Sequence, residues 1–412
     1  MRFEAPRGTH DILPSEQPLW QRVLGEAEAL CALYGYRRIQ TPVFEDTELF
    51  QRTSGTGSDV VRKEMYTFTD RGNRSLTLRP EGTAPIVRAY LEHGLHREPQ
   101  PAKLYTIATM YRYSAPQRGR YREHWQLSVE AIGSADPAVD AELIQLYDEL
   151  LRRLGVTRYE LQLNSIGDRA CRPAYVERLT AWLDEHEGVL DAEAKEKRRT
   201  SPLRVFDTKD PRVAEVLADA PAIGDSLCDE CREHFAQVRA FLDGYGVRYQ
   251  VVPTLVRGLD YYTRTTFEFV DEAIGAQSTI CGGGRYDYLA EELGGPPTPG
   301  IGFGAGIERL LLSLEASGFQ VRERPRPEVF FALHEGAPRE RVLVEMTKLR
   351  AKGLACDTDY AGRSIKGQIT YANRIGVPVL IEVVNESQVV LRRRGQPDFT
   401  GTLGEVIERL HR

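Results

Sequence analysis

Polar and apolar residues alternate with a period of two between Arg120 and Glu130, with Glu123 as the exception. The polar positions are Arg120, Arg122, His124, Gln126, Ser128 and Glu130, and the apolar positions between them include Trp125, Leu127 and Val129. Side chains two positions apart lie on one face of a strand, so the pattern predicts a strand with its apolar face on a core. Residues 103–113 predict a second strand, and the breakers Pro116 and Gly119 predict the turn between the two. The stretch therefore predicts an antiparallel hairpin with one strongly polar face.

The tip of this hairpin is crowded with positive charge, carried by Arg112, Arg118, Arg120 and Arg122. The repulsion between these arginines costs free energy unless an anion binds among them. A strand face in plain water is the simpler interpretation, but the charges are separated by sign along the strand, with a carboxylate at the far end. Because the guanidinium group binds phosphate oxygens in pairs, we interpret the tip as a site for polyphosphate or a nucleic-acid backbone.

Hydrophobic periodicity and breaker residues predict further elements on both sides of the hairpin. Helices are predicted at residues 15–33, 136–154 and 307–314 and from Thr83 onward, and strands at 37–41, 66–69, 75–79, 159–163, 249–252, 261–270, 277–281 and 300–306. Residues 167–244 are charged, mostly helical and free of convincing strand patterns, which indicates a helical insertion.

A segment rich in proline and arginine, residues 322–327, marks a domain boundary. Strands and helices alternate beyond it, with strands at 329–332, 355–358, 377–383 and 389–393 and helices at 339–352, 364–374 and from 403. This alternation is typical of a small α/β domain. We therefore predict an α+β core on an antiparallel sheet over residues 1–325, interrupted by the insertion at 167–244, and a C-terminal α/β domain over 326–412.

Composition adds limits to this picture. The chain has 412 residues, of which 41% are hydrophobic and 28% charged, as in ordinary globular proteins of two or three domains. The net charge of −6 argues against a general affinity for nucleic acid, so any such binding depends on a local patch. The first residues lack the apolar core of a signal peptide, and apolar runs are too short to span a bilayer. No association with membranes is expected.

Six cysteines are scattered over the chain, which favours reduced thiols and a cytoplasmic location. Only Cys228 and Cys231 have the spacing of metal ligands. A structural zinc site needs four ligands, and no second pair follows at a suitable spacing. Cys171 and His234 could complete the set, but two reduced thiols on a helix are the default interpretation, and no protein metal ligands are assigned.

The glycines at 300–306 loosely fit a dinucleotide fingerprint, although no βαβ return follows them. Close packing of backbone explains them better. Glu308 and Arg309 follow at the start of a helix, where an exposed surface pair is as plausible as a functional one. Arg257 precedes a glycine beside two tyrosines, and it could be a cation–π contact or a clamp for a reacting phosphate.

These stretches together resemble the class II histidyl-tRNA synthetases over essentially the whole chain. Residues 7–11, 35–45, 110–133 and 300–309 resemble the N-terminal signature and motifs 1, 2 and 3 of that family. The most specific likenesses are Arg-Pro-Glu-Gly-Thr at 79–83, Leu-Val-Arg-Gly-Leu-Asp-Tyr-Tyr at 255–262 and Cys-Gly-Gly-Gly-Arg-Tyr-Asp at 281–287. Residues from 328 onward resemble the anticodon-binding domain of the family.

The resemblance implies ATP-dependent activation of histidine, with Mg²⁺, and transfer to the 3′ end of the histidine tRNA by a cytoplasmic homodimer. It assigns Arg112 and Arg257 to the α-phosphate as the catalytic residues. The implied histidine-binding set is Glu81, Thr83, Arg112, Gln126, Glu130, Arg257, Tyr261 and Tyr262. The implied ATP-binding set is Arg112, Arg120, His124 and Arg309, and the implied tRNA contacts are Gln117, Arg118, Arg363 and Lys366.

Two positions depart from the family pattern. Ser114 and Ala115 stand where the family usually has Glu-Arg, which reads adenine and the acceptor stem, and His124 stands where an aromatic ring usually stacks on adenine. One alternative is a non-catalytic paralogue, the histidine-binding regulatory subunit of ATP phosphoribosyltransferase. It needs neither Arg257 nor a domain after residue 327. Another class II synthetase, prolyl or threonyl, is disfavoured by the 255–262 block.

Overall fold

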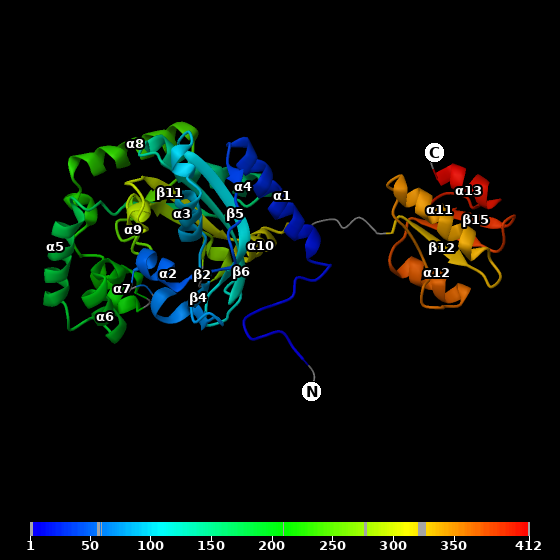
Figure 1. The fold of residues 1–412 in the computed structure, drawn as a ribbon, viewed down its shortest axis with the longest axis horizontal. Coiled ribbons are helices and arrows are strands. Elements are labelled where there is room, and N and C mark those ends of the chain that lie inside the picture. The colour runs from blue at the N-terminus through cyan, green and yellow to red at the C-terminus, as the bar shows by residue number, and fades with distance from the viewer. Residues whose placement is uncertain are drawn as a thin grey trace. The chain divides into compact units, whose positions relative to one another are not determined.

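The computed structural model describes residues 3–55, 58, 60–208, 210–275, 278–319 and 327–410. The chain forms two compact units, Met1–Val321 and Arg322–Arg412 (Figure 1). The boundary expected from the sequence, between residues 325 and 326, lies outside the described residues. In the part of the chain that is described, no helix is both long and apolar enough to cross a membrane.

The first unit is built on an eight-stranded sheet. Its strand order is β1 (Arg37–Arg38), β5 (Ala102–Tyr111), β6 (Glu123–Ile132), β11 (Gly300–Gly306), β10 (Thr279–Arg285), β9 (Thr263–Val270), β7 (Glu160–Ser165) and β8 (Gln250–Val251). The outermost pairs, β1 with β5 and β7 with β8, are parallel, and all pairs between them are antiparallel. The predicted α+β class with an antiparallel central sheet is confirmed.

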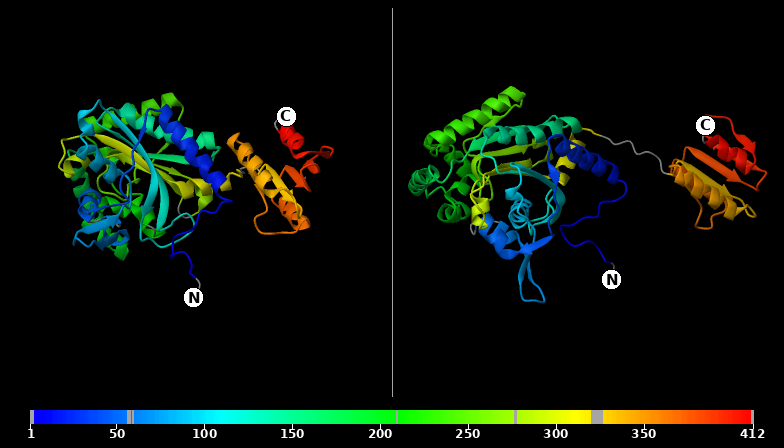
Figure 2. Two further views of the ribbon diagram at one scale, coloured as in Figure 1. Left: turned by 45° about the vertical axis from the view of Figure 1, so that its right-hand side comes forward. Right: turned by 45° about the horizontal axis from the view of Figure 1, so that its top comes forward.

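One face of this sheet is covered by α1 (Gln17–Leu33), α4 (Pro137–Leu154) and α10 (Ile307–Ala316) (Figure 2). Helix α4 begins where predicted, because the Asp136 carboxylate accepts the Ala138 N–H at 2.9 Å and Pro137 follows it. Its Tyr147 ring packs edge-on against Phe269 of β9 and Phe303 of β11, at 4.9 and 5.3 Å between centroids. These contacts fill the core under the sheet.

A smaller three-stranded sheet lies beside the first, in the order β2 (Phe44–Asp46), β4 (Ser75–Leu78) and β3 (Tyr66–Thr69). The hairpin of β3 and β4 is where the sequence predicts it, but β2 and the helix α2 (Thr47–Ser54) were not predicted. Asp46 caps α2 by accepting the Glu48 N–H at 2.9 Å. A π-helical turn, Val60–Glu64, precedes β3, and α3 (Thr83–Glu92) and the turn Leu95–Arg97 follow β4.

Residues 167–244 contain no strand at their described positions. Their elements are α5 (Arg172–Glu185), α6 (Ala192–Thr200), the 3-10 turns Pro202–Asp207 and Ile223–Ser226, α7 (Pro211–Leu217) and α8 (Asp229–Tyr245). Helices α5, α6 and α7 gather at one end of the unit, away from α1 (Figure 1). Helix α8 instead packs along α4, and its Val238 and Leu242 are fully buried in the main core. The last helix of the predicted insertion therefore also covers the sheet.

Strand β10 continues through Gly282, Gly283 and Gly284, where the sequence analysis ended it. A Cβ on Gly283 would lie 2.3 Å from the Gly302 carbonyl oxygen and 2.7 Å from the Phe267 ring. The glycines thus let β10 lie between β9 and β11 in a crowded part of the sheet. The remaining short elements of this unit are the turn Glu272–Ile274 and α9 (Leu289–Glu292).

The second unit is a five-stranded sheet in the order β13 (Cys356–Thr358), β12 (Val329–Leu333), β14 (Val379–Val383), β15 (Val389–Arg393) and β16 (Phe399–Gly401). Its first three strands are parallel and the last two pairs are antiparallel. Phe331 faces a core with α11 (Arg339–Ala351) and α13 (Leu403–Leu410), while Phe330 faces α12 (Ile365–Arg374). The predicted α/β domain is present, and β16 was not predicted.

A buried ion pair joins β10 to α4. Arg285 and Asp140 are both fully buried, and Arg285 Nε donates to the two Asp140 oxygens at 3.0 and 3.1 Å. The remaining guanidinium nitrogens donate to Asp287 Oδ1 and to the Ser134 carbonyl oxygen, each at 2.8 Å. Each guanidinium nitrogen thus has an acceptor, and the pair fixes the end of β10 against the first turn of α4.

We expect Asp140→Asn to destabilise the first unit by about 3 kcal/mol, because it leaves the Arg285 charge buried with less compensation. Glu48→Gln is the matched control, since it removes a carboxylate from the exposed pair with Arg52 and should cost about 0.5 kcal/mol or less. Thermal unfolding of both variants measures the difference. Equal melting temperatures would show that the buried pair contributes no more than a surface pair.

Candidate active site

A cavity of about 300 Å³ opens on the sheet of the first unit. Its wall comes from β6, β10 and β11, from the loop between β5 and β6, from the segments that lead into α3 and β9, and from the start of α10. Of the residues assigned to catalysis, histidine or ATP, all except Glu130 line it: Glu81, Thr83, Arg112, Arg120, His124, Gln126, Arg257, Tyr261, Tyr262 and Arg309. Segments far apart in sequence therefore contribute to one cavity.

Arginines form one end of this cavity. Arg112 Nε donates to the Pro80 carbonyl oxygen at 2.7 Å, and Arg309 donates from Nε to Gly119 O at 3.0 Å and from Nη1 to Thr279 O at 2.6 Å. Arg120 Nη2 lies 2.8 Å from Glu64 Oε1, and Arg257 pairs with Glu268. Backbone carbonyls and two carboxylates thus fix the four guanidinium groups at the wall.

The arginines still repel one another. The pKa of Arg309 is lowered to about 10 by burial and by the positive charges of Arg120, Arg112 and Arg257. The same surroundings lower the pKa of His124 to about 3, through burial and then the charges of Arg112 and Arg309. His124 is therefore a neutral ring at any physiological pH. The excess of positive charge makes this end of the cavity suited to a polyanion.

The other end of the cavity carries a carboxylate. Glu81 accepts the Thr83 N–H at 2.7 Å and the Ala84 N–H at 2.9 Å, so it caps α3. Thr83 Oγ1 donates to Glu130 Oε1 at 2.8 Å. Burial raises the pKa of Glu81, while its backbone hydrogen bonds oppose the shift.

Glu130 lies underneath this end of the cavity and is fully buried. It accepts hydrogen bonds from Thr83 Oγ1 and, at 2.6 Å, from the Tyr286 hydroxyl. Its link to the cavity runs through Thr83. The rings of Tyr261 and Tyr262 lie 4.7 Å apart at the same end, and Gln126 Nε2 donates to Ser128 Oγ at 2.8 Å. Aromatic walls with a carboxylate and an amide suit a small ligand that carries a positive charge.

Two glycines leave room for functional side chains. A Cβ on Gly282 would lie 2.3 Å from the Arg257 guanidinium, and one on Gly304 would lie 2.7 Å from Gln126 Nε2. The glycines at 300–306 form β11 in an antiparallel pair with β6, so they pack backbone closely, and the dinucleotide interpretation is wrong. The glycine run was the sequence signal for this close approach.

Glu308 and Arg309 are not an exposed surface pair. Glu308 is buried, and its carboxylate accepts the Trp125 N–H at 2.8 and 3.1 Å. Burial raises the pKa of Glu308 to about 7. Both side chains line the cavity at the arginine end. The contact with Trp125 also joins the start of α10 to β6.

The residues assigned to tRNA lie elsewhere. Gln117 and Arg118 are exposed at the tip of the loop between β5 and β6, and Arg118 Nη2 lies 3.2 Å from Glu315. Arg122 does not line the cavity, since its guanidinium stacks over the Tyr113 ring at 3.8 Å. In the second unit, Arg363 and Lys366 line a surface hollow at the start of α12.

Several residues of the site were missed by sequence reasoning. Glu64 and Glu268 hold Arg120 and Arg257, and Tyr121 lines the cavity. Ser114, which was noted only as a departure from the family pattern, lines the cavity as well. Ser114 Oγ is buried without a hydrogen-bond partner among the described residues. Only Glu268 left a usable signal, because it alternates with Phe267 and Phe269 along β9.

Comparisons with known proteins bear on the family of this chain. The family profile of histidyl-tRNA synthetase matches residues 8–310, and that of the anticodon binding domain matches residues 339–412. The histidine–tRNA ligase of Caldanaerobacter subterraneus is 46% identical, covering 99% of both chains. That of Desulforudis audaxviator is 47% identical, covering 100% of this chain and 99% of its own. The apo structure of S. aureus histidyl-tRNA synthetase superposes with a TM-score of 0.83 at 36% identity, covering both chains fully. The chain belongs to the histidyl-tRNA synthetase family.

Proposed function

We propose that this protein is a histidine–tRNA ligase, which activates L-histidine with ATP and transfers it to the 3′ end of the histidine tRNA. The observation that carries the proposal is that Arg112, Arg257 and Arg309 line one cavity together with Glu81 and two tyrosines. The cavity thus offers adjoining binding places to a polyanion and an amino acid. Relatives that share nearly half of all residues along the whole chain are histidine–tRNA ligases.

Arg112 and Arg257 are assigned to the α-phosphate of ATP. The histidine carboxylate is already ionised at neutral pH, so it attacks phosphorus without a general base. The C–O–P linkage forms as the bond to the leaving pyrophosphate breaks, and negative charge grows on the oxygens around phosphorus. Guanidinium groups fixed in advance by Pro80 O and Glu268 neutralise that charge without having to reorganise.

Mg²⁺ is expected to enter with ATP, mainly on the phosphate oxygens, where it neutralises charge on the leaving pyrophosphate. Glu308 is the cavity-lining carboxylate at the arginine end. A carboxylate suits the preference of this ion for oxygen ligands, and Glu308 would hold it. Glu81 lies with the tyrosines and is assigned to the substrate ammonium instead.

Histidine is assigned to the end of the cavity near Glu81. Glu81 and Thr83 would receive the ammonium group, while Gln126, Tyr261 and Tyr262 would surround the imidazole. Glu130 acts on this end by fixing the Thr83 hydroxyl. A pocket that hydrogen-bonds the imidazole rejects isosteres strongly, because they leave buried partners unpaired.

Adenine is assigned to the wall that contains His124. The neutral imidazole offers a flat face for stacking, and Arg120 and Arg309 lie beside it. The buried Ser114 hydroxyl is free to hydrogen-bond the base in place of the glutamate that the family usually has there. The departures at positions 114 and 124 thus keep polar and stacking partners for adenine.

tRNA is assigned to two surfaces, the exposed tip with Gln117 and Arg118 and the hollow with Arg363 and Lys366. The regulatory-subunit alternative is not favoured, because ligases align along the entire chain, including the C-terminal unit.

A homodimer in the cytoplasm remains our expectation. The exposed aromatic pair of Phe44 and Phe68, with rings 6.3 Å apart on the small sheet, is consistent with a protein interface there.

We expect Arg257→Ala to lower histidine-dependent ATP–pyrophosphate exchange by at least about 100-fold, because one charge on the transition state is lost. Arg118→Ala is the matched control, since that arginine is exposed outside the cavity and should leave exchange unchanged. Exchange rates at saturating histidine, with melting curves for both variants, provide the measurement. Undiminished exchange in a folded Arg257→Ala protein would contradict the assignment.

Ala115→Arg should alter charging of tRNA while leaving the exchange reaction nearly untouched. Ala115 is exposed on the loop and does not line the cavity, so an arginine there meets tRNA rather than ATP. Aminoacylation and exchange are measured on the same preparation. An equal loss in both reactions would mean that this part of the loop serves ATP.

His124→Phe should keep the KM for ATP within about threefold, because a neutral ring replaces a neutral ring, whereas His124→Ala should raise it about tenfold by loss of stacking. Since the pKa of His124 is about 3, the exchange rate between pH 6 and pH 8 should have the same profile in wild type and in His124→Phe. A changed profile would show that the imidazole titrates during the reaction.

A further inference from the structure

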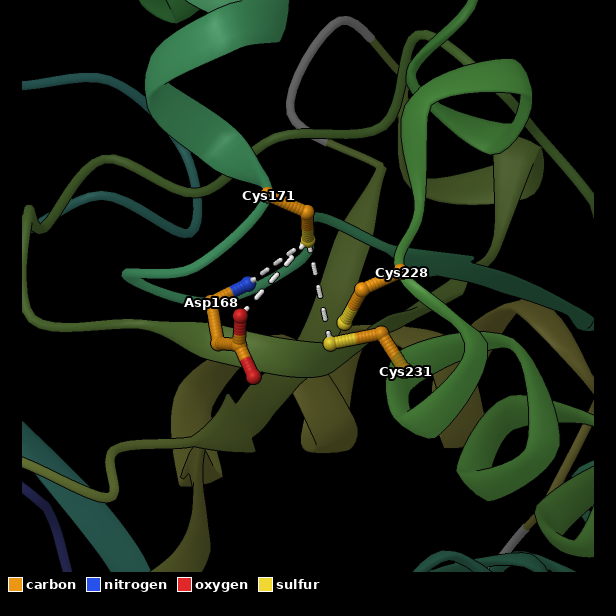
Figure 3. A group of neighbouring side chains, drawn as sticks. All are labelled: Asp168, Cys171, Cys228 and Cys231. Atoms are coloured by element: carbon orange, nitrogen blue, oxygen red, sulfur yellow. Dashed lines mark hydrogen bonds between the residues drawn. The ribbon is translucent and has the colours of Figure 1, made fainter.

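Four potential metal ligands, from the start of the helical insertion and from the start of its last helix, meet outside the cavity described above. Asp168 and Cys171 lie in the turn between β7 and α5, and Cys228 and Cys231 lie at the start of α8 (Figure 3). The carboxylate oxygen of Asp168 and the three sulfurs all lie within 4.8 Å of one another. Three of the four residues are buried, and Cys228 is half-buried.

We propose that Asp168, Cys171, Cys228 and Cys231 hold a structural Zn²⁺ ion. Zn–S bonds of about 2.3 Å and Zn–O bonds of about 2.1 Å, at tetrahedral angles, place two sulfurs about 3.8 Å apart and a sulfur and an oxygen about 3.6 Å apart. The sulfurs of Cys171 and Cys231 are 3.8 Å apart, and Cys171 Sγ lies 3.6 Å from Asp168 Oδ1. Each thiol releases its proton to solvent as its Zn–S bond forms.

The surroundings of the cluster support the ligand assignment. The Asp168 backbone N–H points at Cys171 Sγ, at 3.5 Å, and Asp168 Oδ2 lies 3.1 Å from Arg264 Nη2. Such outer contacts orient ligands and offset the negative charge of a site rich in thiolates. Gly167 has φ +64°, and a Cβ there would lie 2.7 Å from Cys171 Sγ. Four protein ligands close the coordination sphere, as in structural rather than catalytic zinc sites.

His234, the fourth ligand considered from the sequence, is directed elsewhere. Its Nε2 lies 3.6 Å from Asp140 Oδ2, beside the buried Arg285. Asp168 takes its place in the cluster. A disulfide explains the cluster less well, because three cysteines leave one thiol over whichever pair is oxidised.

The proposed ion would fasten the insertion beside the substrate cavity. Arg172 Nη2 donates to Gly167 O at 2.9 Å and to Tyr262 O at 2.6 Å, and the Arg264 N–H donates to Gly167 O at 2.7 Å. The turn that carries Asp168 and Cys171 thus holds the backbone of Tyr262, which lines the cavity. Zinc would fix that turn to α8, and its loss would loosen one wall of the cavity.

The test is the metal content of the untagged full-length protein, produced with added zinc and measured by plasma mass spectrometry. We expect about one zinc per chain in wild type. Cys228→Ser should bind zinc at least about tenfold more weakly. This variant keeps the fold testable, because Cys228 is the N-cap of α8 without a side-chain capping bond, and serine is a better N-cap. Cys231→Ser is the second variant.

Cys356→Ser is the matched control, because it removes a buried thiol from the other unit and should leave zinc content unchanged. Replacing zinc with Co²⁺ should give the visible d–d bands of a tetrahedral site and a sulfur-to-cobalt charge-transfer band, both lost in Cys228→Ser. Wild-type protein that stays free of zinc in its presence, that keeps all zinc in both cysteine variants, or that carries a Cys171–Cys231 disulfide instead would overturn the proposal. None of these readouts depends on catalysis.

Discussion

Like charges held close together are the constraint on which this structure depends. Arg112, Arg120, Arg257 and Arg309 line one cavity, and burial together with the charges of the other three arginines lowers the pKa of the Arg309 guanidinium. The folded chain holds them there with backbone carbonyls and with the carboxylates of Glu64 and Glu268. The free energy gained by burying the core under the sheet therefore holds the four arginines in an electrostatically unfavourable arrangement. An incoming polyphosphate relieves that repulsion, so binding and the ordering of the cavity wall favour each other.

The antiparallel sheet makes this arrangement possible. The neighbouring strands β6, β11 and β10 bring residues that are far apart in sequence to within reach of one ligand. Glycines on β10 and β11 leave space for the side chains of Arg257 and Gln126. The buried pair of Arg285 and Asp140 fixes the far end of β10. Strand pairing and packing under the sheet thus set the floor of the cavity, and Arg112 and Arg257 reach it from the loop between β5 and β6 and from the segment that leads into β9.

Much of this could be predicted from the sequence. The alternation in β6 gave the hairpin and its polar face, and the resemblance to synthetases gave ten residues that the fold brings to one cavity. Local reasoning failed where tertiary partners decide the outcome. Thr83 looks like a helix cap, but Glu81 caps the helix because its side chain folds back onto α3, and this frees the Thr83 hydroxyl for Glu130. Glu308 looks exposed, yet it is buried, and the backbone N–H of Trp125 on β6 donates a hydrogen bond to its carboxylate. The cysteine pair could not be interpreted, because its partners lie on the other side of the insertion.

The position of Glu81 has a further consequence. Its carboxylate caps the N-terminus of α3 by accepting two backbone N–H groups. The same carboxylate lines the cavity at the place assigned to the amino acid. Helix stability and ligand recognition therefore share one functional group, and neither can change without affecting the other. Redesign of the amino-acid preference would have to begin elsewhere on the cavity wall, at residues such as Gln126 that do not cap a helix. This coupling restricts which mutational routes toward a new specificity pass through folded intermediates.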